Sequence, residues 1–369
     1  MKRWGGIFTI STVGGLAAVG ALFTAGMYTF NMSKHSVQFA YAPASTIEAR
    51  EVPRHVPPPE DGVHALYMTS WVAGTSDWRN DIVDFVDQNP RLNALVIDVK
   101  DYTGEVAWKE RVKDMPNFIE YLHQHGIYAI ARITVFQDPL YAKAHPEDAI
   151  KHTNGRLWSD KNGLHYVDPK AHAFWDYIVD IAKESERMGF DELNFDYIRF
   201  PSDGPVMQAR FPYWDQERES RVEALDEFFS YLRAQLREVA VPISADVFGL
   251  TTWQEDDLNI GQMLENIALY FDYVAPMVYP SHYPPTFQGF KNPAAHPYEI
   301  VYTAMERGVF RIEQMGGNPK RLRPWLQDFD LGATYDAPMI QKQIKAVEDA
   351  GLDSWMMWDP SNKYTRSAY

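Results

Sequence analysis

Short apolar runs alternate with longer stretches of helical period along the chain from His64 onward. Eight runs are apolar over most of their length, which is typical of parallel strands that are covered on both faces. They read HALYMTSWV, LNALVIDVK, IYAIARITVF, DELNFDYIRF, VPISADVFGL, DYVAPMVYP, RLRPWLQDF and LDSWMMWDP. An amphipathic stretch follows each of the first seven runs, and several of these stretches stop at a glycine, as at Gly126, Gly189 and Gly351.

This order of elements predicts an α/β fold with one closed (β/α)8 TIM barrel in residues 63–369. An open doubly wound sheet is the alternative, and it would need a phosphate-binding, glycine-rich turn after the first strand. No G-x-G-x-x-G motif follows that strand. We therefore expect the barrel, with its active site where the strands end.

The N-terminal segment differs from the rest of the chain. Lys2 and Arg3 precede an uncharged stretch, residues 4–30, that is rich in Gly, Ala, Leu and Val. This stretch is long enough to cross the roughly 30 Å core of a bilayer, and the basic start favours an N-terminus inside the cell. We expect residues 1–30 to be an uncleaved signal-anchor, so that the protein is exported and its barrel lies on the extracytoplasmic side of the membrane.

A cleaved signal peptide is the alternative interpretation of this segment, and it would make the protein secreted. The Ala-Tyr-Ala sequence at 40–42 resembles a cleavage site, but it lies far from the apolar stretch and Pro43 follows it. Residues 31–62 are polar and then proline-rich, which predicts a semi-extended linker between the anchor and the barrel.

Charge and composition narrow the possible partners. Lys and Arg number 35 against 50 Asp and Glu, which gives a net charge of −15. This balance argues against nucleic acid or an anionic membrane surface as the main partner. The chain has no cysteine, which excludes a disulfide framework, a thiolate zinc site and a thiol nucleophile. Aromatic residues make up 14%, a share that suits a site stacking flat apolar ring faces.

Polar side chains recur late in the predicted strands, where a barrel places its active site. Alternation along a strand puts Asn194 and Asp196 on one face, and it puts Ser244 and Asp246 on one face of the next strand. A carboxylate among apolar residues is costly unless it has a partner or a role. By contrast, an aspartate at a strand end is often only a cap or a loop acceptor, which is an equally good interpretation of Asp328.

Two carboxyl groups at one cleft are what glycoside cleavage requires. One donates a proton to the leaving oxygen, and the other stays ionised as nucleophile or as base for water. Asp196 and Asp246 are the predicted catalytic pair, with Asp98 as a reserve. Which of the pair is the acid stays open. If Arg132 or Arg199 lies beside Asp196, that carboxyl stays ionised, and Asp246 among its apolar neighbours becomes the better acid.

Other polar and aromatic side chains at the strand ends are candidates for binding the substrate. They are Asp98, Lys100, Arg132, Asn194, Arg199, Tyr279, His282 and Trp358. The simpler alternative is that the cations form structural ion pairs with the aspartates and that the aromatic rings pack in the core. The 11 histidines are scattered and no H-x-H motif ends the first strand, so we expect neither a metal ion nor another cofactor.

Several longer motifs resemble the bacterial "putative glycosyl hydrolase" family, a TIM-barrel domain of unknown function. The motifs are VIDVKDYTGEV, ARITVFQDP, YVDPKAHAFWDYIVDIAKE, GFDELNFDYIRFPSDG, SADVFGL, DYVAPMVYPSHY and WMMWDPSNKY. The resemblance covers residues 63 to 365, so it leaves out the N-terminal anchor and the linker. It implies a hydrolase that acts on a glycan, without supplying the catalytic residues or the substrate.

From the residues and this resemblance we predict a glycoside hydrolase that cleaves a cell-surface or extracellular polysaccharide by paired-carboxylate acid/base catalysis. The first alternative is a non-catalytic glycan-binding barrel anchored at the cell surface, which would keep the aromatic rings and would not need the carboxyl pair. A metal-dependent hydrolase on the same barrel and an inert scaffold are further alternatives.

Overall fold

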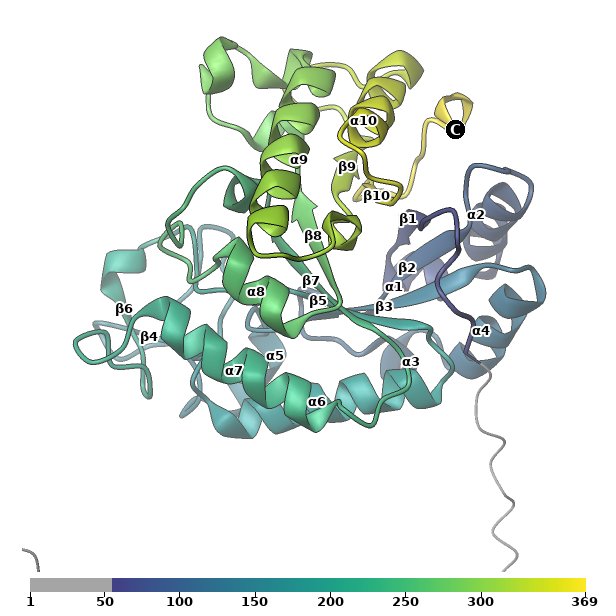
Figure 1. The fold of residues 1–369 in the computed structure, drawn as a ribbon. Coiled ribbons are helices and arrows are strands. Elements are labelled where there is room, and N and C mark those ends of the chain that lie inside the picture. Colours follow the sequence, from purple (N-terminus) through teal and green to yellow (C-terminus); the bar gives the residue numbers. More distant parts are fainter. Residues whose placement is uncertain (1–54) are drawn as a thin grey trace, which may run out of the picture. The chain divides into compact units, whose positions relative to one another are not determined.

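Eight parallel strands close into a barrel in the computed structural model, which describes residues 55–369 (Figure 1). Around the barrel the strand order is β1, β10, β9, β8, β7, β5, β3 and β2. The strands are β1 (His64–Met68), β2 (Ala94–Lys100), β3 (Tyr128–Thr134), β5 (Glu192–Asp196), β7 (Ile243–Phe248), β8 (Tyr273–Met277), β9 (Trp325–Gln327) and β10 (Trp355–Trp358). Each of the eight predicted apolar runs contains one of them, which confirms the (β/α)8 barrel.

Helices cover the outside of the barrel (Figure 1). The longer ones are α2 (Ser76–Asp87), α4 (Met115–Gln124), α6 (His172–Arg187), α7 (Arg221–Gln235), α8 (Leu264–Tyr270), α9 (Pro297–Gln314) and α10 (Ala337–Asp349). The short ones are α1 (Ser70–Ala73), α3 (Ala107–Glu110) and α5 (Pro139–Ala144). The predicted helix stops are confirmed, because Gly126, Gly189 and Gly351 follow α4, α6 and α10 with φ of 69°, 103° and 82°.

Two apolar layers stabilise this arrangement. The larger lies between the outer faces of the strands and the helices, and it includes Ile97, Ile133 and Phe195. The smaller fills the inside of the barrel, and it includes Val96 and Ile130. Successive side chains of one strand point to opposite faces, so each strand supplies both layers and reads as apolar throughout.

Two long loops join above the barrel and extend its carboxyl-end face. A two-stranded antiparallel sheet pairs β4 (Lys151–His152) with β6 (Ala209–Arg210). These strands belong to the segments after β3 and β5, for which the sequence pattern predicts no regular structure. Short 3-10 helices complete the loops, at Val206–Gln208, Gly249–Thr252, Pro280–His282, Phe287–Gly289, Pro293–Ala295, Pro319–Arg321 and Arg366–Ala368.

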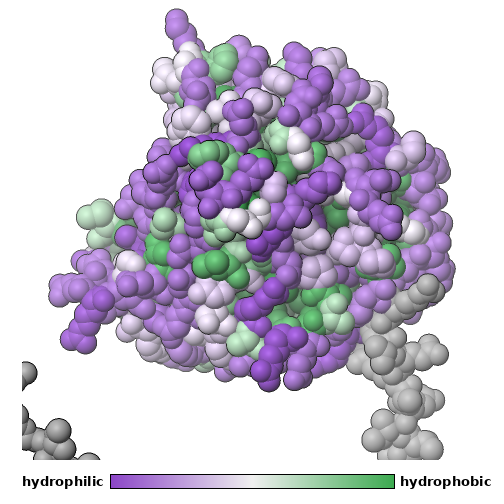
Figure 2. Space-filling model, viewed as in Figure 1, coloured by the Kyte–Doolittle hydropathy of each residue, from purple (hydrophilic) through white to green (hydrophobic). Residues whose placement is uncertain are grey.

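The surface in view is mainly hydrophilic. Figure 2 shows hydrophilic residues over most of the visible face, with hydrophobic residues in small separate groups. The predicted signal-anchor and most of the predicted linker lie outside the described residues. Within 55–369, no helix combines the length and the apolar character needed to cross a membrane. The end of the predicted linker packs on the barrel, where the Val56 amide donates to Asp191 Oδ1 at 2.6 Å.

Candidate active site

The predicted catalytic pair lies side by side at the carboxyl ends of two neighbouring strands. In the pairing of β5 with β7, Asn194 is opposite Ser244 and Phe195 is opposite Ala245. Asp196 and Asp246 come next in the same register. Both line a cavity of about 410 Å³ at the mouth of the barrel, so the structure brings the two carboxyl groups into one site.

One guanidinium contacts both carboxyl groups. Arg132 on β3 forms an ion pair through Nη2 with Asp196 Oδ2, and its Nε lies 3.7 Å from Asp246 Oδ2. Its Nη1 donates to Asp98 Oδ1 at 2.6 Å, and Tyr67 donates its hydroxyl to the other oxygen of Asp98 at 2.5 Å. Asp98 therefore holds Arg132 from the inside of the barrel, and Arg132 in turn orients Asp196.

This shared contact limits the distance between Asp196 and Asp246. Their oxygens touch neighbouring nitrogens of one planar group. The two carboxyl groups consequently lie close together, below the upper limit of about 9.5 Å for glycosidase pairs. A wider separation would have favoured a purely binding barrel, and the structure does not have it.

Asp246 sits in surroundings that favour its protonated form. Its Oδ1 accepts hydrogen bonds from Asn194 Nδ2 at 2.8 Å and from Trp325 Nε1 at 2.7 Å. Its Oδ2 is buried and has no hydrogen-bond partner within residues 55–369. Burial, and then the negative charge of Asp196, raise the pKa of Asp246 well above its ordinary value, while Arg132 opposes the shift. When this carboxyl is protonated, the proton belongs on Oδ2, because two donors already occupy Oδ1.

Asp196 is followed by a strained residue. Tyr197 has φ of 53°, in the left-handed region that residues with a side chain rarely adopt. Its amide turns back and donates to Asp196 Oδ1 at 2.5 Å. Such conformations cost of order 1–3 kcal/mol and gather at functional sites, where the surroundings enforce them. The strain here accompanies a carboxylate whose two oxygens are both fixed, one by Tyr197 and one by Arg132.

An aromatic wall forms one side of the cavity. Tyr279, just after β8, stacks on Trp358 of β10 with ring centroids 5.2 Å apart and planes at 29°. Phe329 meets both rings edge to face, and His282 meets Tyr279 in the same way. Burial, followed by the charge of Asp246, raises the pKa of Tyr279 well above its usual value, so its hydroxyl stays protonated. The predicted residues Tyr279, His282 and Trp358 all line the cavity.

Lys100 is a correction to the predicted substrate-binding set. A β-bulge between Asp98 and Lys100 shifts the register with β3, so that Lys100 pairs with Ile133 of the outer layer. The ammonium group is fully buried there, 2.9 Å from Asp138 Oδ2, and it donates to the Thr134 carbonyl at 2.7 Å. Lys100 therefore forms a structural ion pair between strand and helix layers, away from the cavity.

Asp98 and Asn194 are also corrected, because neither lines the cavity. Both are buried beneath it and act on the residues that do line it. Asp98 binds Arg132, and Asn194 donates to both Asp246 and Ser244. Alternation placed them on the inner face of their strands, but beneath the residues that line the cavity.

Several cavity-lining residues are missing from the predicted set. They include Lys161, Tyr197, Ser202, Asp203, Phe248 and Trp325. Lys161, Ser202 and Asp203 come from the two long loops after β3 and β5. Trp325 lies two residues before Gln327 on β9, so strict alternation along that strand would have found it.

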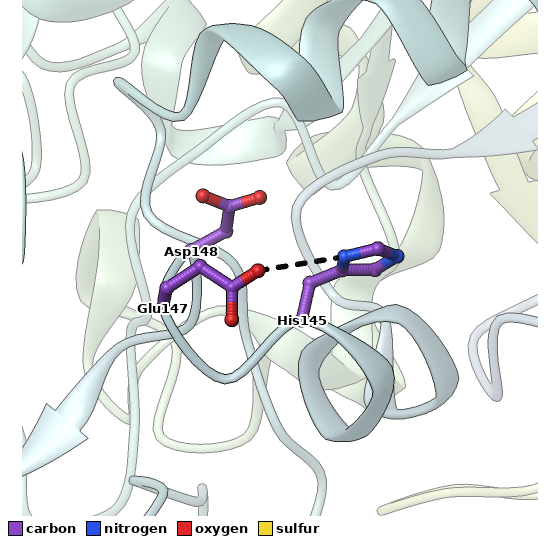
Figure 3. A group of neighbouring side chains, drawn as sticks. All are labelled: His145, Glu147 and Asp148. Carbon is purple, nitrogen blue, oxygen red and sulfur yellow. Dashed lines mark ion pairs between the residues drawn. The ribbon is translucent and has the colours of Figure 1, made fainter.

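The described residues contain one group with the spacing of metal ligands. His145, Glu147 and Asp148 place one possible ligand atom each within 4.8 Å of one another, and Figure 3 shows Asp148 beside the ion pair of the other two. The Asp148 oxygens already accept hydrogen bonds from Tyr141 and Tyr213. None of the three lines the cavity, so this group does not support a metal-dependent version of the reaction there.

Comparisons with known proteins identify the family of the chain. A family model described as "putative glycosyl hydrolase domain" matches residues 65–364. The search of curated proteins finds no relative. A hypothetical protein from Ruminiclostridium thermocellum ATCC 27405 is 33% identical over 49% of this chain and 97% of its own, with a TM-score of 0.44.

Two more distant solved structures share the fold. The glycoside hydrolase domain of PgaB (BpsB) from Bordetella bronchiseptica has a TM-score of 0.59 at 14% identity, covering 84% of this chain and 98% of its own. The catalytic domain of β-amylase from Paenibacillus polymyxa has a TM-score of 0.54 at 10% identity, covering 85% of this chain and 95% of its own. At such identities the likeness concerns the barrel alone.

Proposed function

Because the chain belongs to the "putative glycosyl hydrolase" family, we propose that it cleaves a polysaccharide with Asp246 as general acid and Asp196 as its ionised partner. The observation that carries this proposal is the difference between two carboxyl groups in one cavity. Asp246 is buried, its burial raises its pKa, and its Oδ2 has no hydrogen-bond partner within residues 55–369, whereas Asp196 forms an ion pair with Arg132. Two carboxyl groups with opposite surroundings are the pattern that glycoside cleavage uses.

The reaction starts when a glycosidic bond lies between the two carboxyl groups. The proton moves from Oδ2 of Asp246 to the bridging oxygen, and the bond from that oxygen to the anomeric carbon breaks. Positive charge develops on the sugar ring, which the carboxylate of Asp196 faces. The anomeric carbon then bonds either to Asp196 or to a water molecule that Asp196 deprotonates. Water supplies the new hydroxyl group in both cases, and its proton returns to the carboxyl pair. Arg132 keeps that carboxylate in place, and Asn194 and Trp325 hold Oδ1 of Asp246, which leaves Oδ2 to carry the proton.

The location of the substrate follows from the N-terminal segment. We infer that residues 4–30 anchor the protein and that the barrel acts outside the membrane on a cell-surface or extracellular polysaccharide. The support is the uncharged run after Lys2 and Arg3. Protease accessibility of the barrel in intact cells tests this placement, and N-terminal sequencing of the mature protein separates a retained anchor from a cleaved signal peptide.

Hydrolysis is tested on a panel of neutral, acidic and amino polysaccharides with the full chain, by release of reducing ends. Asp196→Asn and Asp246→Asn should each abolish release of reducing ends from whichever glycan the wild type cleaves. Asp328→Asn is the matched control, because Asp328 is a buried aspartate after a barrel strand that does not line the cavity. Unchanged turnover in both site variants would rule out the proposed pair.

A non-catalytic glycan-binding barrel is the second candidate, and the aromatic wall favours it. Stacked rings such as Tyr279 and Trp358 hold a sugar whether or not it is cleaved. The same panel separates the two functions. Saturable binding of a glycan by the wild type, with no release of reducing ends, would favour the binding barrel.

A further inference from the structure

The buried cations of the structure differ in one respect. Four Lys or Arg side chains are buried within residues 55–369, namely Lys100, Arg199, Arg311 and Arg323. Three of them have a carboxylate partner, which is Asp138 at 2.9 Å, Glu265 at 2.5 Å and Glu192 at 2.8 Å, respectively. Arg199 forms no ion pair with any acidic side chain in this part of the chain. A buried charge without a counter-charge is costly, so Arg199 is the one that calls for an explanation.

Arg199 is held rigidly at the cavity. It follows β5 and lines the cavity. Its guanidinium carbon lies 4.8 Å from the ring centroids of both Tyr197 and Phe248, so two aromatic faces fix its plane. Its Nη1 donates to the Phe200 carbonyl and to Ser202 Oγ, each at 3.2 Å. Nε and Nη2 have no hydrogen-bond partner within residues 55–369, which leaves one edge of the fork free.

The other cations at the cavity are already neutralised. Lys161 lies 3.0 Å from Asp203, and Arg132 is shared between Asp98 and Asp196. Arg199 is therefore the cavity-lining Lys or Arg, within residues 55–369, that has no ion-pair partner. The free edge of a guanidinium presents two parallel N–H groups, which match the two oxygens of a carboxylate.

We infer that Arg199 binds the carboxylate of an acidic sugar, so that the substrate of the proposed hydrolase is a polysaccharide containing uronic acid. This inference rests on the proposed function and names its substrate class. The net charge of −15 gives a polyanion no long-range attraction. Recognition is therefore a short-range contact at one sugar, and a single carboxylate matches the single free cation.

Binding of monosaccharide probes tests the inference without knowledge of the natural polysaccharide. The full chain is titrated with the methyl glycosides of glucuronate, galacturonate and mannuronate, each beside its neutral parent sugar, by isothermal calorimetry or ligand-observed NMR. At least one acidic probe should bind more tightly than its parent, on the order of ten- to a hundredfold, as expected for a hydrogen-bonded charge pair. Equal binding of every pair by the wild type would overturn the inference.

Substitutions test whether Arg199 causes the preference for acidic probes. Arg199→Gln should bring the acidic-to-neutral ratio close to one, and Ser202→Ala should lower it by loosening the guanidinium. Arg210→Gln is the matched control, since Arg210 also donates to backbone carbonyls but does not line the cavity, and it should keep the wild-type ratio. A ratio that survives both Arg199→Gln and Ser202→Ala in folded protein would overturn the assignment.

The inference and the proposed function fail in different ways. Cleavage of neutral glycans that Asp246→Asn abolishes, together with no preference for acidic probes, would overturn the inference alone. The opposite result is a preference for acidic probes that depends on Arg199, with no cleavage of any uronate-containing polysaccharide. That result would overturn the proposed hydrolase function and would keep Arg199 as a binding site for acidic sugars.

Discussion

The two ends of the barrel use the same residue types in different proportions. At the amino end, Arg323 donates through Nη1 to both oxygens of Glu192 at 2.8 and 2.9 Å. Tyr128 adds a hydrogen bond to Glu192 at 3.2 Å, and the ring of Tyr273 lies 4.1 Å from the guanidinium carbon. One cation meets one anion there, and aromatic rings surround both.

At the carboxyl end the charges do not match. Arg132 is shared by Asp98, Asp196 and Asp246, while Arg199 has no carboxylate partner within the described residues. A balanced pair is a way to bury polar groups inside a barrel. Beside the cavity, burial and a neighbouring carboxylate raise the pKa of Asp246, and Arg199 is left without an ion pair; the proposed function uses both features. The two ends therefore differ in how their charges match more than in residue type, and the end with the mismatch of charges is the one that borders the cavity.

Removal of the protonated carboxyl should have the largest effect. Asp246→Asn keeps the oxygen that accepts from Asn194 and Trp325 but has no acidic proton, so hydrolysis should fall by about 10²- to 10⁴-fold. Steady-state rates on the substrate found in the glycan panel measure this loss. A fall of less than tenfold would mean that Asp246 only supports the structure.

The same variant should be no less stable than the wild type at neutral pH. Burial raises the pKa of Asp246 in the folded state above the ~3.9 of an unfolded chain. The folded state then binds the proton more tightly, so the stability of the wild type falls as pH rises from the unfolded pKa to the folded one. Asp246→Asn removes this pH-dependent loss of stability, because asparagine does not titrate. Urea unfolding of both proteins at pH 4 and pH 8 should show the variant gaining on the wild type at the higher pH.

The balanced pair at the amino end should behave in the opposite way. Glu192→Gln leaves Arg323 buried without its counter-charge and should destabilise the protein by about 3–5 kcal/mol. Turnover per folded molecule should stay at the wild-type value, because neither residue lines the active-site cavity. Glu255→Gln is the control, since Glu255 pairs with Arg307 on the surface and such pairs contribute about 1 kcal/mol or less. Equal unfolding midpoints for the two variants would contradict the comparison.

Loss of one support of Asp246 should have a smaller, pH-dependent effect. Trp325→Phe removes a hydrogen bond to Oδ1 that lowers the pKa of Asp246. The alkaline limb of the pH–rate profile should therefore move to higher pH, and turnover at the optimum should fall about two- to tenfold. Trp355→Phe is a buried tryptophan control in the outer layer, and its limb should not move. If the rates of Trp325→Phe fell at every pH while the alkaline limb stayed at the same pH, Trp325 would act by packing alone and its hydrogen bond would not set the pKa of Asp246.

The barrel could be predicted from the sequence because its pattern is local. Each strand carries its own apolar run, and each helix carries its own stripe and stop signal. The placement of Asp196 and Asp246 followed from the same local rule, since alternation and neighbouring strands are enough to bring two strand ends together. The position of Lys100 did not follow, because a bulge after Asp98 reversed the alternation for one residue. Nothing in VIDVK distinguishes a bulged strand from a regular one.

The remaining site residues depend on contacts between distant parts of the chain. Lys161 and Asp203 reach the cavity from two loops whose paths depend on the pairing of β4 with β6, far apart in sequence. The sequence DYIRF could not show that Arg199 lacks an ion-pair partner, because ion pairing depends on which acidic side chains lie nearby in space. Sequence patterns therefore predicted that Asp196 and Asp246 lie together, and only the three-dimensional arrangement showed which buried cation has no ion-pair partner.

The aromatic wall should contribute the smallest effect, because it binds substrate without taking part in proton transfer. Trp358→Ala removes the ring that stacks on Tyr279 and should raise KM about two- to tenfold, as the loss of an aromatic pair implies, with kcat little changed. Trp78→Ala is the control, since that ring is 62% exposed on α2, and its KM should equal that of the wild type. If Trp358→Ala instead lowered kcat as much as it raised KM, the wall would be orienting the sugar between Asp196 and Asp246. The mismatch of charges would then not be the only feature at this end of the barrel that acts in the transition state.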